Sequence, residues 1–135
     1  MNPIRPIEVD LIIAINRQVC HGSGEPFQVR DRGLLESAVH AAFYPGIPPY
    51  VNGGLAGVVG ALGYSIIKNH CFENGNKRTA TLVMAMLFKV AGYNLLYPGN
   101  SFADVVEETA KSDASKAKEA KEELALWLDC HKTQN

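Results

Sequence analysis

The chain has 135 residues, a length that suits one domain with a single substantial core. Its 13 Lys and Arg residues nearly balance its 14 Asp and Glu residues, which argues against a nucleic-acid partner. Three widely spaced cysteines (Cys20, Cys71 and Cys130) argue against a disulfide framework and a structural zinc site. No signal-peptide pattern and no apolar run of about 20 residues occurs. We therefore expect one cytoplasmic domain over residues 1–135, with no membrane partner.

Two helices are predicted in the first third of the chain. Apolar residues at helical spacing predict a helix over about residues 7–21, with Pro6 in its first turn and Gly22 as its C-cap. Asp31 is the predicted N-cap of a second helix that ends near Phe43.

Residues 44–54 contain three prolines, three glycines and two tyrosines and cannot continue a helix. We expect a loop or a short hairpin flap there. Its tyrosines either pack the loop onto the body of the protein or dock a partner.

Two strongly apolar helices are predicted next, over about residues 55–68 and 80–91. In the first, glycine recurs at every third position, and each glycine costs roughly 1 kcal/mol relative to alanine in a helix interior. This spacing predicts close approach by another helix; the glycines are Gly54, Gly57, Gly60 and Gly63. The second helix is apolar nearly all round, which predicts a place in the middle of a bundle.

The C-terminal part is predicted to contain a short extended piece and two more helices. Residues 93–99 read as the extended piece and a turn. Ser101 and Asp104 resemble a capping box before a helix over about 102–112. Residues 115–131 form an amphipathic pattern that closes the bundle. No alternation long enough for a sheet appears, so we expect an all-α bundle of about six helices.

The polar stretch between the two apolar helices, residues 69–79, combines one histidine with asparagines, a glycine and two cations. Its structural interpretation is a turn in which Asn76 caps the next helix, with Lys77 and Arg78 merely solvated. However, cations at a helix N-terminus oppose the macrodipole unless an anion lies between them and the amides. This favours a phosphate site, in which helix amides, Lys77 and Arg78 hold the phosphate oxygens.

His70 lies six or more residues before these cations and is a suitable general base for a hydroxyl that attacks a bound phosphate. Phe72 is expected to anchor the loop in the core, so that His70 faces the other way. A P-loop does not fit, because no Gly-Lys pair exists and a helix precedes the motif. A Cys71 nucleophile and metal sites at the two Cys-His pairs (Cys20-His21 and Cys130-His131) are weaker interpretations; a buried inert Cys71 fits better.

The motif from His70 to Arg78, His-Cys-Phe-Glu-Asn-Gly-Asn-Lys-Arg, resembles the His-x-Phe-x-(Asp/Asn)-x-Asn-Lys-Arg motif of the Doc (death-on-curing) branch of the Fic/Doc superfamily. Residues 29–38 resemble the second-helix segment of the family, and residues 67–70 its approach to the motif. The resemblance implies a compact Fic-type helical bundle.

By the same resemblance, the protein is a toxin of a toxin–antitoxin pair: a kinase that moves the γ-phosphate of ATP to a threonine of translation elongation factor Tu. His70 is then the general base. Lys77, Arg78, Asn76 and Gly75 hold phosphates. A small antitoxin with an amphipathic C-terminal helix is the implied neutralising partner; the glycine-rich helix and the proline-rich loop are possible places for its groove.

Two features leave alternatives open. In the larger Fic branch a glycine occupies the position of Lys77 and AMP is transferred, so an adenylyltransferase is one alternative. The superfamily often has a carboxylate for Mg²⁺ at the position of Asn74, whose amide oxygen is a weaker ligand. A binding module without turnover is therefore the other alternative.

Overall fold

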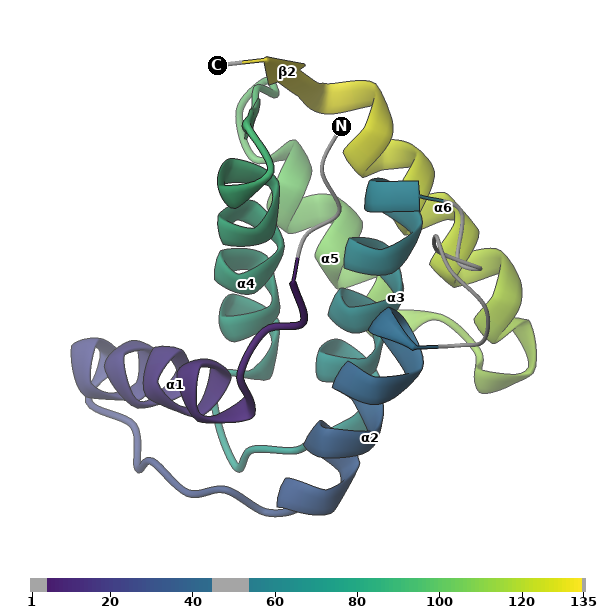
Figure 1. Cartoon of the computed structure of the whole chain (residues 1–135). Coiled ribbons are helices and arrows are strands. Elements are labelled where there is room, and N and C mark those ends of the chain that lie inside the picture. The colour runs from purple at the N-terminus through teal and green to yellow at the C-terminus, as the bar shows by residue number, and fades with distance from the viewer. Residues whose placement is uncertain (1–4, 45–53, 135) are drawn as a thin grey trace.

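The computed structural model describes residues 5–44 and 54–134, and within these ranges the chain is helical with one very small sheet (Figure 1). The elements are α1 (Val9–Ser23), α2 (Arg32–Phe43), α3 (Gly54–Asn69), α4 (Asn76–Val90), β1 (Tyr93–Leu95), α5 (Ser101–Lys111), the short 3₁₀ helix η1 (Ala114–Lys116), α6 (Ala117–His131) and β2 (Lys132–Gln134). The predicted all-α class is confirmed, with six α-helices in the described ranges. The predicted flap lies almost wholly at 45–53, outside those ranges.

Helix α3 is the centre of the bundle. It packs against α2, α4, α5 and α6, and Asn69 is its only exposed residue (Figure 1). Two of its glycines explain this close packing. A Cβ at Gly60 would lie 3.1 Å from the backbone of Ala125 on α6, and one at Gly63 would lie 2.3 Å from the sulfur of Met84 on α4. The predicted close helix approach is thus confirmed at these two glycines.

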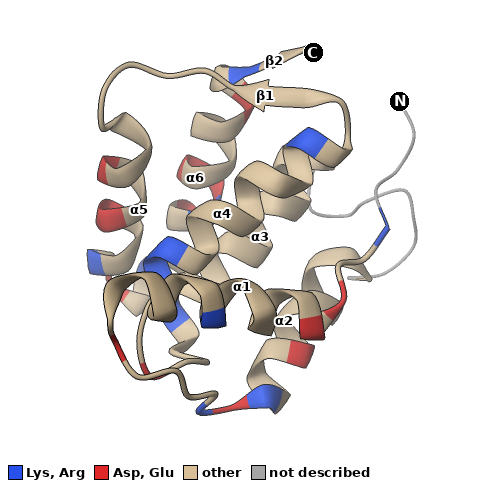
Figure 2. Cartoon of the chain, turned by 90° about the vertical axis from the view of Figure 1, so that its left-hand side faces the viewer, with Lys and Arg blue, Asp and Glu red and all other residues tan. Residues whose placement is uncertain are grey.

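Helix α4 is less enclosed than its apolar sequence predicts. Leu82 is 50% exposed and Val90 71% exposed, so one face of the helix is open. The central position that we expected for α4 belongs to α3. Helix α1 crosses the lower end of α4, near the basic residues that begin α4 (Figure 2).

Several predicted helix ends differ from the observed ones. Helix α1 begins at Val9 and ends at Ser23, and its C-cap is Gly24, in a left-handed conformation with φ 73°, instead of Gly22. Asp31 caps α2 as predicted, since its side chain accepts a hydrogen bond from the Leu34 N–H at 2.9 Å. The predicted Ser101 capping box is wrong: α5 starts at Ser101 itself, with Asn100 as N-cap and no side-chain capping bond.

The sheet joins two distant parts of the chain and was not predicted. β1 and β2 pair antiparallel, with Tyr93 opposite Gln134 and Leu95 opposite Lys132. Each strand has three residues, too few for an alternating pattern to be recognised.

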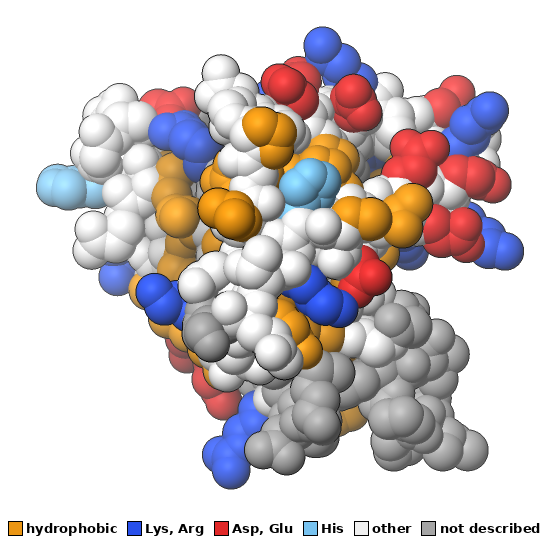
Figure 3. All heavy atoms as spheres, turned by 90° about the horizontal axis from the view of Figure 1, so that it is seen from above, with side chains coloured by type: hydrophobic (Ala, Val, Ile, Leu, Met, Phe, Trp, Pro, Cys, Tyr) orange, Lys and Arg blue, Asp and Glu red, His pale blue; other side chains and the backbone are white. Residues whose placement is uncertain are grey.

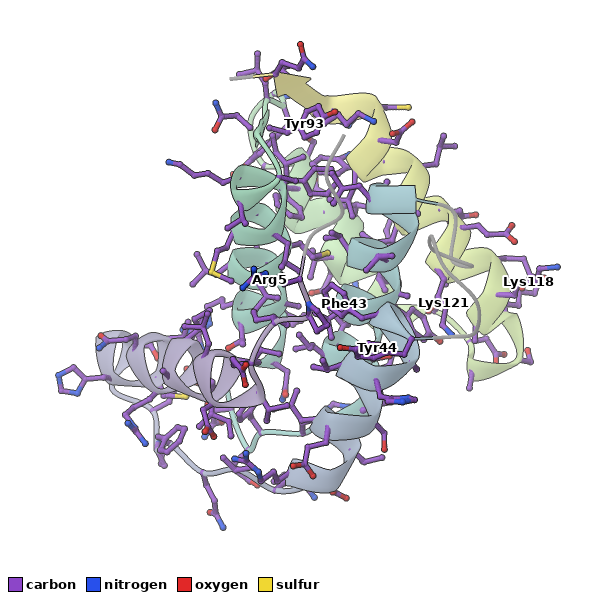
Figure 4. All side chains as sticks on the ribbon, viewed as in Figure 1. Arg5, Phe43, Tyr44, Tyr93, Lys118 and Lys121 are labelled. Atoms are coloured by element: carbon purple, nitrogen blue, oxygen red, sulfur yellow. The ribbon has the colours of Figure 1, made fainter. Side chains whose placement is uncertain are left out.

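Helix α6 closes the bundle as predicted, with Ala120, Leu124 and Leu128 buried. Acidic and basic side chains are mixed along its outer side when the molecule is seen from above (Figure 3). Lys118 points outward, and Lys121 lies 5.3 Å over the ring of Tyr64 on α3 (Figure 4). Within the described ranges, no helix is long and apolar enough to cross a membrane.

Candidate functional site

The loop between α3 and α4 is anchored in the core by Phe72, which is fully buried as predicted. The backbone of the segment before α2 runs beside it. The N–H groups of Arg30 and Asp31 donate to the Cys71 carbonyl at 2.8 and 3.1 Å, and the Glu73 N–H donates to the Gln28 carbonyl at 2.9 Å. These bonds tie the loop to the segment that precedes α2.

The end of α3 before the loop is held equally firmly. The ammonium group of Lys68 donates to the carbonyls of Ala110 and Ser112, at 3.1 and 2.6 Å, at the C-terminus of α5. A cation at this helix end also complements the macrodipole of α5. His70 follows directly after this anchored end; it is exposed and adopts a positive φ of 50°.

Helix α4 begins without a side-chain cap. Gly75 is its N-cap, in a left-handed conformation with φ 76°. Asn76 was expected to be the cap in the structural interpretation, but it is the first helical residue. Its side chain closes the loop by accepting from the Phe72 N–H at 3.2 Å and donating to the Phe72 carbonyl at 2.9 Å. The amides of the first turn therefore lack the usual capping side chain.

Both cations of the motif are exposed and paired with carboxylates from other elements. The ammonium of Lys77 lies 2.7 Å from Oε2 of Glu107 on α5, and the guanidinium of Arg78 contacts Oε1 of Glu25, just after α1. The hydrogen bond from Lys77 lowers the pKa of Glu107 below its ordinary value. The pKa of Glu25 is likewise lowered, first by the Ser23 hydroxyl and then by Arg78. Glu107 and Glu25 thus form ion pairs with the two cations that were expected, from the sequence, to bind phosphate.

These cations line a cavity of about 680 Å³ between α1, α4 and α5. Its wall also includes Tyr97 and Asn100, from the loop that precedes α5, and Glu107. His70 is not among the lining residues. The structure thus brings Lys77 and Arg78 together on one cavity, whereas His70, the expected base, lies on the loop between α3 and α4 and does not line the cavity.

Asn74 is oriented by two hydrogen bonds. Its side-chain amide donates to the Pro26 carbonyl at 3.0 Å, and its own carbonyl accepts from the side chain of Asn16 at 2.8 Å. The neighbouring Glu73 carboxylate is engaged by Arg30 at 3.5 Å. Within the described ranges, no group of three His, Cys, Asp or Glu side chains could hold a metal ion.

Cys71 is fully buried, and burial, together with the charge of Asp31, raises the pKa of its thiol. A raised pKa disfavours the thiolate, so Cys71 fits the predicted inert core residue better than a nucleophile. Cys20 and Cys71 are buried and Cys130 is exposed, all three as free thiols.

Sequence reasoning missed three residues of this region: Asn16, Glu25 and Glu107. The two glutamates left no signal, because they lie 53 and 30 residues from their partners in sequence. Asn16 did leave one. It stands four residues after Ile12 and four before Cys20, both fully buried, so it is a polar residue on the apolar face of the first helix.

A family model described as the Fic/DOC family matches residues 6–88, more than half of the chain. No curated protein and no solved structure matches significantly. The matched range begins before α1, which supplies Asn16, and ends within α4, so it contains the whole loop and both cations. Members of this family are commonly transferases. The chain therefore belongs to the Fic/DOC family.

Proposed function

We propose that this chain is a Doc-type toxin kinase that moves the γ-phosphate of ATP to a threonine hydroxyl of elongation factor Tu. One observation carries the proposal: Lys77 and Arg78 stand in the uncapped first turn of α4 and line the same cavity. Phosphoryl transfer depends mainly on positioning and on electrostatic stabilisation of the transferring group. An uncapped helix N-terminus with two cations supplies both.

The cavity supports a nucleotide as the ligand. Its volume of about 680 Å³ is within the range of small-molecule sites. Tyr97 and Asn100 lie before α5, whereas Glu107, the partner of Lys77, lies about two helical turns further along α5. The aromatic ring and the amide suit a base, and the cations suit phosphates. A nucleotide could therefore lie along α5 with its phosphates toward the first turn of α4.

In this proposal His70 accepts the proton of the attacking hydroxyl. Its exposure on the loop leaves it accessible to a protein substrate. When the nucleotide binds, the ion pairs of Lys77 with Glu107 and of Arg78 with Glu25 break, and both cations bind the phosphates. Asn76 and Gly75 contribute backbone N–H groups, since the Asn76 side chain is engaged with Phe72.

Mg²⁺ fits these residues poorly. Asn74 is the residue that would contribute a ligand, and it offers one neutral oxygen, while Glu73 is paired with Arg30. When bound with ATP, Mg²⁺ neutralises phosphate charge.

The proposed antitoxin needs an apolar groove. The sequence pointed to the glycine-rich helix and to the proline-rich loop. Helix α3 is enclosed and cannot supply a groove, and the loop lies almost wholly outside the described residues. A shallower cavity of about 410 Å³ lies between α1 and α4, lined by Leu11, Ala14, Ile15, Gln18, Leu82 and Met86. Gln18 and Leu82 also line the larger cavity, so a helix seated here would adjoin the cations.

Two alternative functions would use the same cavity. An adenylyltransferase would use the same cavity with the nucleotide reversed. A binding module without turnover is favoured by the carboxylate pairs on Lys77 and Arg78 and by the absence of a carboxylate at Asn74.

The deciding experiment incubates the protein with elongation factor Tu and ATP labelled at either the α or the γ position. We expect label on the target from the γ position only, and none with His70→Ala. His21→Ala is the matched control: His21 is also exposed but lies on α1, so this variant should retain transfer. Label from the α position would identify an adenylyltransferase, and bound ATP without any transfer would identify a binding module.

A further inference from the structure

Asn16 is a wholly buried polar side chain that connects α1 to the loop and to α4. Its amide nitrogen lies 2.8 Å from the carbonyl oxygen of Asn74 and 3.0 Å from the hydroxyl oxygen of Thr79. Asn16 and Thr79 are each 0% exposed. Burying a side-chain amide costs little folding free energy only where the amide forms hydrogen bonds. Here both acceptors lie at the start of α4.

The bond to Asn74 determines how the following peptide is oriented. A trans peptide is planar, so its C=O and N–H groups point in opposite directions. Because the Asn74 carbonyl points to Asn16 on α1, the Gly75 N–H points away from α1. The same peptide begins the left-handed turn at Gly75 that starts α4.

Several side chains of α1 contact this turn. The sulfur of Cys20 lies 3.6 Å from the Asn74 carbonyl and 3.6 Å from the side-chain oxygen of Asn16. A Cβ at Gly75 would lie 3.0 Å from Val19 and 3.2 Å from the Asn16 amide nitrogen. The turn is thus packed directly against α1, and Asn16 is the one strong donor at this contact.

We propose that Asn16 is a positioning residue, whose amide fixes the Asn74–Gly75 peptide and with it the start of α4, where Lys77 and Arg78 line the cavity. That these cations bind a nucleotide phosphate rests on the proposed function. The fixing of the peptide does not, and the mobility of this segment can be measured on the free protein.

The test compares Asn16→Leu, which is similar in size and has no donor, with Thr79→Val, which removes the other acceptor and leaves the bond to Asn74. Backbone ¹⁵N order parameters of residues 74–78 are measured first. We expect values of about 0.85 in the wild type and in Thr79→Val, falling below about 0.6 in Asn16→Leu. ATP affinity, measured by calorimetry, should fall about tenfold in Asn16→Leu and less than twofold in Thr79→Val.

A rigid loop with unchanged order parameters in Asn16→Leu, or an equal loss in Thr79→Val, would overturn the proposal. Asn16→Ala serves if the leucine variant does not fold, with the same expectation. If the wild type does not bind ATP, the proposed function fails, and the order parameters still decide the role of Asn16.

Discussion

The ammonium group of Lys77 lies 2.7 Å from a carboxylate oxygen of Glu107, so a cation at the start of α4 is neutralised by a residue on α5. Glu107 competes with any anion for this cation. We predict that Glu107→Gln raises the affinity for ATP about three- to tenfold, because the carboxylate next to the phosphates is removed. Glu108→Gln is the matched control: Glu108 is the exposed next residue and forms no ion pair with the described residues. Calorimetry on both variants measures the difference, and equal affinities would refute the competition.

The same pair predicts a pH dependence of stability. Lys77 lowers the folded-state pKa of Glu107 below its ordinary value of 4.5. The stabilisation is therefore fully present above about pH 4.5 and is lost as the pH falls through the lowered folded pKa. We expect wild type to exceed Glu107→Gln in unfolding free energy at pH 7, with the difference disappearing as the pH falls through the lowered folded-state pKa of Glu107. Urea unfolding at a series of decreasing pH values measures it, and a difference that does not decrease on acidification would contradict the ion-pair origin.

Gly75 is predicted to be intolerant of any side chain. Its φ of 76° costs an L-residue about 1–2 kcal/mol, and a Cβ would also press on Val19 at 3.0 Å. Gly75→Ala should therefore lower the free energy of unfolding by at least about 1 kcal/mol. Gly22→Ala is the control within α1, where nothing lies within 4 Å, and it should stabilise by about 0.5–1 kcal/mol. Equal effects of the two changes in urea unfolding would argue against strain at Gly75.

Leu82 is predicted to contribute to antitoxin binding, since it is half exposed and lines both cavities beside α1. Leu82→Glu should weaken binding of the proposed antitoxin by at least about tenfold, because a charge replaces apolar area that its helix would cover. Leu126→Glu on α6, where Leu126 is 63% exposed, is the control and should bind normally. Pull-down of the two proteins after co-expression checks this, and wild-type binding by Leu82→Glu would exclude the groove between α1 and α4.

The helical class, most helix positions and the polar motif could be predicted from the amino-acid sequence. Helical spacing is a local property, and a cap such as Asp31 contacts residues only three positions away. Gly60 and Gly63 also indicated close packing, because glycine destabilises a helix interior and is expected there only where a neighbouring helix leaves no room for a side chain. The motif was recognisable because its residues lie within one short segment.

The groups that contact this motif could be identified only from the packing of the helices. The partners of Lys77, Arg78 and Asn74 come from α5, the end of α1 and the interior of α1, through contacts that span 30 to 58 residues of sequence. The two cavities also arise only when α1 crosses α4. These contacts are set by how helices pack, and local periodicity contains no information on which distant side chains that packing brings together.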